Sequence, residues 1–315
     1  MSVLVTGAAG FIGSHVCEAL LGRGQTVVGL DSFDDFYSPS VKRDNLSGCL
    51  HDSRFTLVEG DIRDIDLTTA TMSRGGVEAV LHLAARAGVR PSIENPLLYQ
   101  DVNVGGTTVM LEAARRVGVT RFVFASSSSV YGNNRKVPFA ETDNVDFPIS
   151  PYAATKRAGE LLCHAYHHLF GLHVTCLRFF TVYGPRQRPD LAIHKFARLI
   201  ERDEPIPVFG DGSTMRDYTF IADIVDGTLR ALDRCNGYHV YNLGESRPIR
   251  LSDLIAALEA ALGNKSRIER HPPQAGDVER TFADLTLAKA DLGYAPKTEL
   301  RDGLAKFVTW LRRQA

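Results

Sequence analysis

Short apolar runs alternate with longer amphipathic stretches along the first half of the chain. The runs short enough to be strands are residues 2–6, 26–31, 55–60, 77–85, 121–125 and 174–180. Helical patterns lie between them, the clearest at residues 11–21, 99–117 and 152–170. The fourth run is apolar throughout, as in a parallel strand covered on both faces. This alternation predicts an α/β fold with a doubly wound parallel sheet.

A glycine turn joins the first strand pattern to the first helix. Gly7, Gly10 and Gly13 are spaced G-x-x-G-x-x-G, and the second strand ends on Asp31, 18 residues after Gly13. In such a turn the first glycine permits the tight bend, the second lets backbone N–H groups approach a pyrophosphate, and the third packs helix on strand. The positive helix end then faces the phosphates. This frame predicts a Rossmann site in which Asp31 binds the adenine-ribose hydroxyls and favours NAD over NADP.

The second half of the chain carries shorter, mixed elements. Helical patterns are expected at residues 192–202, 222–234, 251–262, 285–292 and 300–311, with short strands at 207–209 and 240–243. We therefore expect residues 1–177 to form an NAD-binding Rossmann domain to which 216–242 return. Residues 178–215 and 243–315 are expected to form a smaller, mixed α/β lobe that binds the substrate.

Composition narrows the classes of function. The chain has 315 residues and a net charge of −1, which gives no global attraction to nucleic acid or to an anionic membrane surface. The five cysteines are scattered without C-x-x-C spacing, so neither a metal site nor a disulfide framework is expected. Because no signal peptide or membrane-length apolar run is apparent, we expect a cytoplasmic protein.

One helical pattern carries candidate chemistry. Tyr152 and Lys156 are four residues apart and share a helix face, and Pro151 suits the first helical turn. A phenol ionises near pH 10, and a neighbouring ammonium lowers that pKa, so the pair is a candidate acid/base. A lone pair of this spacing is more often an ordinary amphipathic helix. The serines at 126–129 strengthen the chemical interpretation, because they follow a parallel strand where open α/β sheets bind ligands.

Three motifs taken together resemble the extended short-chain dehydrogenase/reductase family. They are residues 6–13 (Thr-Gly-Ala-Ala-Gly-Phe-Ile-Gly), 126–132 (Ser-Ser-Ser-Ser-Val-Tyr-Gly) and 152–156 (Tyr-Ala-Ala-Thr-Lys). Within that family, residues 178–190 (Arg-Phe-Phe-Thr-Val-Tyr-Gly-Pro-Arg-Gln-Arg-Pro-Asp) look like the UDP-glucuronate 4-epimerases. Residues 209–212 and 216–217 are similar to the family's nucleotide-sugar segment.

The resemblance implies roles for particular residues. Tyr152 is the acid/base, Lys156 binds the nicotinamide ribose and lowers the tyrosine pKa, and Ser127 is the catalytic hydroxyl. The implied NAD-binding set, which also includes Tyr152 and Lys156, is Gly7, Gly10, Phe11, Ile12, Gly13, Asp31, Asp61, Ile62, Leu83, Ala84, Ala85 and Asn103. The implied or candidate substrate-binding set is Ser127, Ser128, Thr181, Arg188, Lys195, Val208, Phe209, Arg216 and Arg90, of which Ser128, Thr181 and Arg90 or Arg188 are candidates for a sugar carboxylate.

Departures from sibling subfamilies separate the possible reactions. The related dehydratases place an Asp-Glu pair, and the decarboxylases a Glu, where this chain has Ser128-Ser129. Without a carboxyl group there, the proton transfers of dehydration lack an agent. Residues 274–277 (Gln-Ala-Gly-Asp) also lack an arginine that many UDP-hexose epimerases use on the diphosphate, for which Arg280 or Lys195 would compensate.

We therefore predict an isomerase that epimerises a UDP-sugar at C4 with bound NAD through a 4-keto intermediate, most specifically UDP-glucuronate to UDP-galacturonate. A UDP-glucose or UDP-N-acetylglucosamine 4-epimerase is the alternative of the same class. A non-catalytic NAD-binding protein is the alternative of another class. The resemblance also implies a homodimer formed by the helices at 97–118 and 152–170. No metal is expected.

Overall fold

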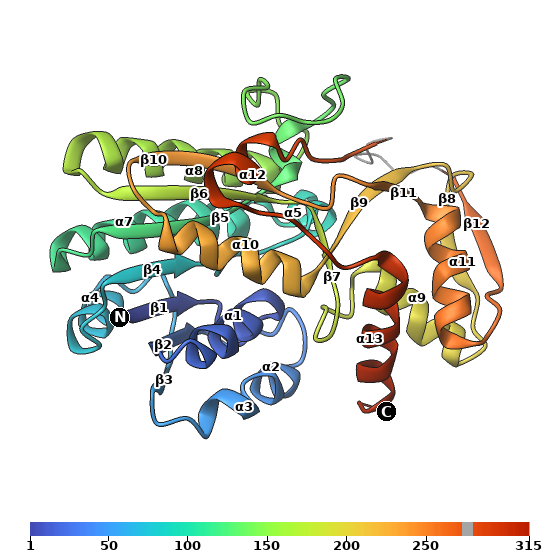
Figure 1. Ribbon diagram of the computed structural model, residues 1–315, viewed down its shortest axis with the longest axis horizontal. Helices are drawn as coiled ribbons and strands as arrows, with labels where there is room; N and C mark the ends of the chain where they lie inside the picture. Colours follow the sequence, from blue (N-terminus) through green and yellow to red (C-terminus); the bar gives the residue numbers. More distant parts are fainter. Residues whose placement is uncertain (273–279, 315) are drawn as a thin grey trace.

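The large sheet of the protein is parallel throughout. The computed structural model describes residues 1–272 and 280–314, and its seven-stranded sheet has the order β10-β6-β5-β4-β1-β2-β3 (Figure 1). All its strand pairs run parallel. The strands are β1 (Ser2–Thr6), β2 (Thr26–Asp31), β3 (Phe55–Glu59), β4 (Ala79–His82), β5 (Arg121–Ser127), β6 (His173–Phe179) and β10 (Tyr238–Leu243). The predicted doubly wound α/β fold is confirmed.

Helices cover both faces of this sheet. Val3 and Val5 of β1 belong to the core formed with α1 (Phe11–Gly22) and α10 (Ile221–Asp233). Leu4 points to the other core, formed with α4 (Ile65–Arg74), α7 (Gly106–Val117) and α8 (Pro151–Phe170). Successive strand side chains alternate between faces, so apolar runs bury both sides and hold a layer of helices against each.

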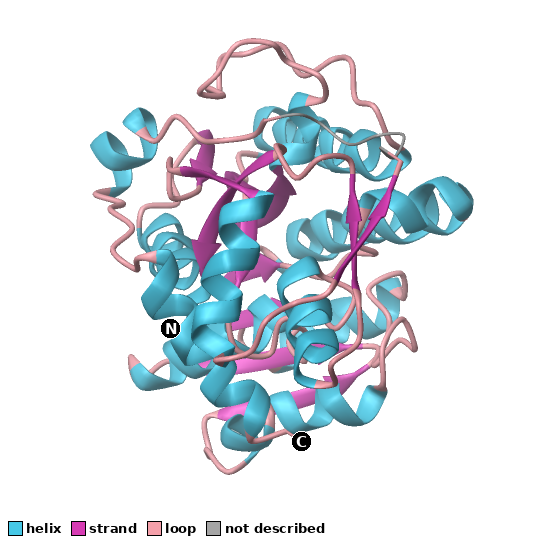
Figure 2. Ribbon diagram, turned by 90° about the vertical axis from the view of Figure 1, so that its right-hand side faces the viewer, coloured by secondary structure: helices cyan, strands magenta, loops and turns pink. Residues whose placement is uncertain are grey.

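A smaller region lies beside the large sheet. It contains a three-stranded sheet of order β11-β9-β7 and a two-stranded β12-β8 sheet (Figure 2, in which this region faces the viewer). Its strands are β7 (Thr181–Tyr183), β8 (Ile206–Phe209), β9 (Met215–Phe220), β11 (Pro248–Arg250) and β12 (Ile268–His271), and its helices are α9 (Ala192–Glu201), α11 (Leu251–Leu262) and α13 (Leu300–Arg312). Helix α12 (Thr286–Leu292) instead packs against β10 and α10 of the large-sheet region. Phe307 of α13 and Val3 of β1 belong to one continuous apolar core, so the two regions pack as one body.

The segment expected as one helix over 99–117 is instead composite. It comprises α6 (Pro96–Tyr99), a π-helical turn (Gln100–Gly105) and α7. The buried Asn103 side chain lies on the π turn, and Gly106 leaves room for Ile62, whose Cδ1 would lie 2.5 Å from a Cβ there. Inserted π turns often occur at functional sites.

Several elements had no clear sequence signal. The polar stretch after β2 forms two short helices, α2 (Pro39–Asn45) and α3 (Ser47–Leu50), and α5 (Val89–Glu94) follows β4. Residues 216–221 were expected only to lead into a helix, yet β9 pairs there with β7 and β11. After it, α10 and β10 join the large sheet. In the described residues, none of the helices is both long enough and apolar enough to cross a membrane.

Candidate active site

A cavity of about 550 Å³ opens at the carboxyl ends of the parallel strands, within the range of small-molecule sites. It brings together residues from the glycine turn, the loops after β2, β3 and β4, the serine segment after β5 and helix α8. The predicted site residues that line it are Gly7, Gly10, Phe11, Ile12, Gly13, Asp31, Asp61, Ile62, Leu83, Ala84, Ala85, Ser127, Ser128, Tyr152, Lys156, Thr181 and Arg188. Open α/β sheets bind ligands at this edge.

The glycine turn packs too closely for side chains. Gly7 has a φ of +68°, and a Cβ on it would lie 2.9 Å from the Ala84 nitrogen. A Cβ on Gly13 would lie 2.0 Å from the Gly7 oxygen, so only glycine allows α1 to approach the turn. Among the described residues no side chain caps the start of α1. Its first N–H groups are therefore available to an anionic group in the cavity.

Asp31 ends β2 beside this turn. Its carboxylate accepts hydrogen bonds from the Ala9 N–H (2.9 Å) and the Phe33 N–H (2.8 Å). Burial raises the pKa of Asp31, and these two bonds oppose that shift. Each oxygen has a second lone pair, so the carboxylate can still accept from a ligand hydroxyl. Farther along the edge, Asp61 is paired with Arg63 at 2.6 Å.

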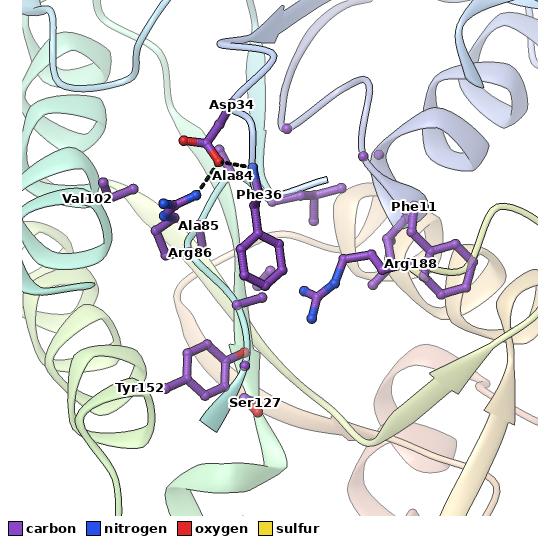
Figure 3. Close-up of a pocket in the computed structure, with 18 of the residues that line it drawn as sticks. Phe11, Asp34, Phe36, Ala84, Ala85, Arg86, Val102, Ser127, Tyr152 and Arg188 are labelled. Atoms are coloured by element: carbon purple, nitrogen blue, oxygen red, sulfur yellow. Dashed lines mark hydrogen bonds and ion pairs between the residues drawn. The ribbon is translucent and has the colours of Figure 1, made fainter. Parts of the chain in front are cut away.

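Helix α8 presents Tyr152 and Lys156 to the cavity. Pro151 occupies its first turn, and the Ser150 hydroxyl caps it by accepting from the Ala153 N–H at 3.1 Å. The helix ends at Gly171, which has a φ of +70°. The Tyr152 hydroxyl points toward Ser127 at the end of β5 (Figure 3). The predicted tyrosine, lysine and serine therefore meet in one place.

The electrostatics of Tyr152 differ from the sequence-based expectation. Burial raises the pKa of Tyr152, while a hydrogen bond with Ser127 and the charge of Arg188 oppose that rise. Lys156 is not among the groups that shift the pKa of Tyr152 here. The Lys156 ammonium donates to the Ala125 carbonyl at 2.7 Å and lies 6.0 Å from the Tyr152 ring centroid. Burial lowers the pKa of Lys156 itself to about 8.

A buried polar network fixes the serine segment to helix α8. Glu160, one turn beyond Lys156, accepts from the Ser126 hydroxyl at 2.6 Å and from two nitrogens of Arg178, each at 2.9 Å. Arg178 also donates to the Tyr131 hydroxyl at 3.0 Å. Glu160 and Arg178 are fully buried. Ser126, which precedes Ser127, is thus bonded to α8, and Tyr131, in the short helix that follows, is bonded to β6. These contacts fix the chain on both sides of Ser127.

Six predicted site residues do not line the cavity. The Asn103 amide instead binds the backbone of Arg86, accepting from its N–H at 2.7 Å and donating to its carbonyl at 3.0 Å. Arg90 lies over the ring of Phe209, with its guanidinium carbon 5.4 Å from the ring centroid. The others are Lys195 on α9, Val208 and Phe209 on β8, and Arg216 on β9. Arg90 therefore does not line the cavity with the other carboxylate candidates, Ser128, Thr181 and Arg188.

The loop after β2 contributes cavity residues that the sequence analysis missed. They are Asp34, Phe36 and Tyr37, joined by Lys42 on helix α2 and by Arg86 in the loop after β4. The buried hydroxyl of Tyr37 has no hydrogen-bond partner among the described residues. The sequence signal for these residues was a polar, turn-rich stretch directly after Asp31, the acidic residue of the dinucleotide-binding motif. Only the fold shows which of its side chains turn inward.

The remaining sequence hypotheses concern metal ions and residues 274–277. Among residues 1–272 and 280–314, no three His, Cys, Asp or Glu side chains are grouped to hold a metal ion. Residues 274–277, which lack the diphosphate arginine, lie outside the described residues.

The glycine turn, together with Tyr152, Lys156 and Ser127 in the same cavity, is typical of dinucleotide-dependent enzymes. The model of the NAD dependent epimerase/dehydratase family matches residues 3–244, and the chain belongs to that family. The predicted family resemblance is thereby confirmed.

Individual relatives are epimerases. The chain is 45% identical over 328 residues to UDP-glucuronate 4-epimerase 4 of Arabidopsis thaliana, covering 98% of this chain and 75% of that protein. Its structure resembles the UDP-glucuronic acid 4-epimerase of Bacillus cereus in complex with UDP-glucuronic acid and NAD, with a TM-score of 0.95, 37% identity and full coverage of both chains. It also resembles the UDP-glucose 4-epimerase of Thermotoga maritima with UDP-glucose, with a TM-score of 0.92, 34% identity and coverage of 100% and 99%.

Proposed function

We propose that this protein is an NAD-dependent UDP-sugar 4-epimerase whose preferred substrate is UDP-glucuronate, which it converts to UDP-galacturonate. The observation that carries this proposal is the meeting of Tyr152, Ser127 and Lys156 in the cavity that the glycine turn also lines. The epimerases from Arabidopsis thaliana and Bacillus cereus named above support the same reaction.

The residues present fit NAD. The crowded glycine turn leaves space that a Cβ would fill, the start of α1 offers N–H groups, and Asp31 can accept from a ribose. All residues of the NAD-binding prediction except Asn103 line the cavity. Bound NAD supplies a hydride acceptor, and in its reduced form a donor, together with a positive charge near the phenol.

The protein's own residues supply the proton chemistry. Tyr152 removes the proton from the C4 hydroxyl and returns it after the flat 4-keto sugar has turned over. Ser127, whose hydroxyl influences the pKa of Tyr152, shares that proton path. Lys156 is held on the Ala125 carbonyl, where it can bind the nicotinamide ribose beside the phenol. The redox change over the cycle is zero, so one bound NAD serves every turnover.

An acidic sugar suits the same wall of the cavity. Ser128, Thr181 and Arg188 line it, and Arg188 is held by Asp190 through bonds of 3.0 and 2.8 Å. A guanidinium and two hydroxyls can keep a carboxylate in the plane of the ring, which slows loss of CO₂ from the 4-keto acid. Replacing Thr181 with Val then increases UDP-pentose formation. An unchanged product ratio removes Thr181 from this role.

The UDP end of the substrate is assigned to the smaller region. Val208 and Phe209 on β8 are proposed to hold the uracil, and Arg216 the diphosphate, with Lys195 or Arg280 as further cations. Phe209 stacks on His271 with ring centroids 5.1 Å apart, so an aromatic surface exists there. This assignment goes with the proposed division into 1–177 with 216–242, and 178–215 with 243–315.

The test is to incubate the protein with UDP-glucuronate without added NAD and to read the C4 configuration by proton NMR. Conversion to UDP-galacturonate supports the proposal. UDP-glucose and UDP-N-acetylglucosamine run in parallel separate the neutral-sugar epimerase, which the Thermotoga maritima likeness favours as the second candidate. Retained NAD with no turnover of any of the three sugars indicates the non-catalytic binding protein.

We also propose a cytoplasmic homodimer. The outer face of α8 and the neighbouring α6 expose large apolar side chains, with Leu97 80% exposed and Leu169 67% exposed. Large apolar side chains exposed along α8 and on α6 support an interface between two copies of the chain. All five cysteines are buried free thiols, as expected in a reducing compartment. Sedimentation of wild type and a Leu169→Asp variant tests the dimer, which the substitution should weaken.

A further inference from the structure

An ion pair joins two loops that line the cavity. The Arg86 guanidinium, in the loop after β4, is bonded to the Asp34 carboxylate, in the loop after β2. In the sheet, β1 lies between β4 and β2. The bond therefore links the loops on either side of the glycine turn that follows β1. A dinucleotide bound across these strand ends would meet both loops.

Phe36 extends the connection toward the reacting end of the cavity. Its backbone N–H donates to the same Asp34 oxygen at 2.9 Å. Its ring lies between Arg86 and Arg188, with the guanidinium carbons 5.6 and 5.2 Å from the ring centroid (Figure 3). Cations near an aromatic face are attracted to it. Asp34, Phe36 and Arg86, here called the strap, thus form a continuous chain of contacts ending on Arg188.

Both ends of the strap are fixed to the fold. On one side, buried Asn103 of the π turn holds the N–H and carbonyl of Arg86. On the other, the Lys42 ammonium donates to the Asp34 carbonyl, and the Asp31 carboxylate accepts from the Phe33 N–H at 2.8 Å. The strap can therefore open at its centre, the Asp34–Arg86 bond, without unfolding the elements that carry it.

We propose that Asp34, Phe36 and Arg86 are cofactor-retaining residues that close over NAD and keep it bound between turnovers. This inference rests on the proposed function, because an epimerase that lost its reduced cofactor after the first hydride transfer would stop at the 4-keto sugar. All three residues line the cavity together with the glycine turn and Tyr152. Arg86 is mostly shielded, with 18% of its side chain exposed, so its bond is less screened than that of a surface pair.

The experiment measures NAD release rather than activity. The holoenzyme is loaded with radiolabelled NAD, chased with excess unlabelled NAD, and sampled over time by ultrafiltration. Asp34→Asn, Arg86→Gln and the double variant are compared with wild type. Arg43→Gln is the matched control, because Arg43 forms a 2.9 Å pair with Glu59 in the same region but does not line the cavity.

Each single strap variant should release NAD roughly tenfold faster, the scale of one charged hydrogen bond. The double variant should match the single variants, since both remove the same bond. The control should match wild type. Release from the single variants at the wild-type rate overturns the strap. Two single effects that add in the double variant also overturn it, because they would be independent.

Two further measurements keep the outcome clear. Circular dichroism and the thermal midpoint of the apoprotein show whether each variant is folded, and a Phe36→Leu variant tests the strap with the ion pair intact. Phe36→Leu should accelerate release by less than either charge variant. If wild type retains NAD but epimerises no UDP-sugar, the proposed function fails and the release data still decide the strap.

Discussion

Replacing Glu160 with Gln tests whether the buried network holds the catalytic serine in place. Gln matches Glu in shape, so no cavity forms, and its amide oxygen can still accept from the Ser126 hydroxyl. Arg178 then loses its charged partner, to which it now donates two 2.9 Å hydrogen bonds. An amide nitrogen facing a guanidinium cannot accept from it. The perturbation thus leaves one buried positive charge without compensation.

The expected cost is large because both side chains are excluded from water, at 0% and 2% exposure. Breaking a buried ion pair by removing one partner costs about 3–5 kcal/mol. For a chain of this size, roughly 2 °C per kcal/mol applies, so the thermal midpoint should fall by about 6–10 °C. Turnover should also fall, because Ser127 directly follows the serine bonded to Glu160.

Urea and thermal unfolding of wild type and Glu160→Gln measure the effect, with Glu112→Gln as the control. Glu112 pairs with Arg115 and Arg116 on the surface of α7, where such pairs contribute about 1 kcal/mol or less. A loss in Glu160→Gln no larger than in the control would contradict the buried-charge explanation.

The effect has a defined pH dependence. The hydrogen bonds and charge of Arg178 hold the pKa of Glu160 below its ordinary 4.5, although burial opposes them. A carboxyl with a lowered folded-state pKa contributes stability above its unfolded pKa and loses it as pH falls through the folded value. The gap between wild type and Glu160→Gln should therefore stay constant above pH 4.5 and narrow below it. A gap that widened on acidification would contradict this assignment.

The remaining predictions concern the cavity. Tyr152→Phe should keep NAD and lose at least about a hundredfold in turnover, the scale of general acid–base catalysis; NAD content and kcat measure this, and residual activity within about tenfold would mean that another group is the base. Because burial raises the pKa of Tyr152 and Arg188 opposes the rise, kcat/KM should increase with pH, and Arg188→Gln should move that increase to higher pH; an unmoved profile counts against Arg188. Gly13→Ala places a Cβ 2.0 Å from the Gly7 oxygen, so it should abolish NAD binding in equilibrium dialysis.

Much of the site could be predicted because its residues are related by local backbone geometry, which is visible in the sequence. Gly7 and Gly13 are required by a turn that is legible in sequence, and Tyr152 and Lys156 are related by helix periodicity. The pKa of Tyr152 was harder to predict, because it depends on which group the Lys156 ammonium binds. That ammonium bonds to the carbonyl of Ala125, on a strand distant in sequence.

The parts that could not be predicted depend on contacts between distant loops. Asp34 and Arg86 are 52 residues apart, and no periodicity in either loop shows that they meet. Arg90, only four residues beyond Arg86, instead reaches Phe209 of the smaller region. Asn103, on the π turn before α7, binds the backbone of Arg86. Secondary-structure propensities do not reflect such contacts between residues that are distant in sequence.

The edge position of β10 limits how this chain can be divided. β10 is the last strand of the large sheet and pairs with β6 from Val174 to Phe179, although β7, α9, β8, β9 and α10 intervene. A truncated protein ending before residue 238 would expose the unpaired backbone of β6 to solvent. An exposed strand edge of this kind can pair with another chain, which leads to self-association. Expression of the nucleotide-binding half alone should therefore give insoluble material, whereas two fragments split at an exposed loop and co-expressed should reassemble.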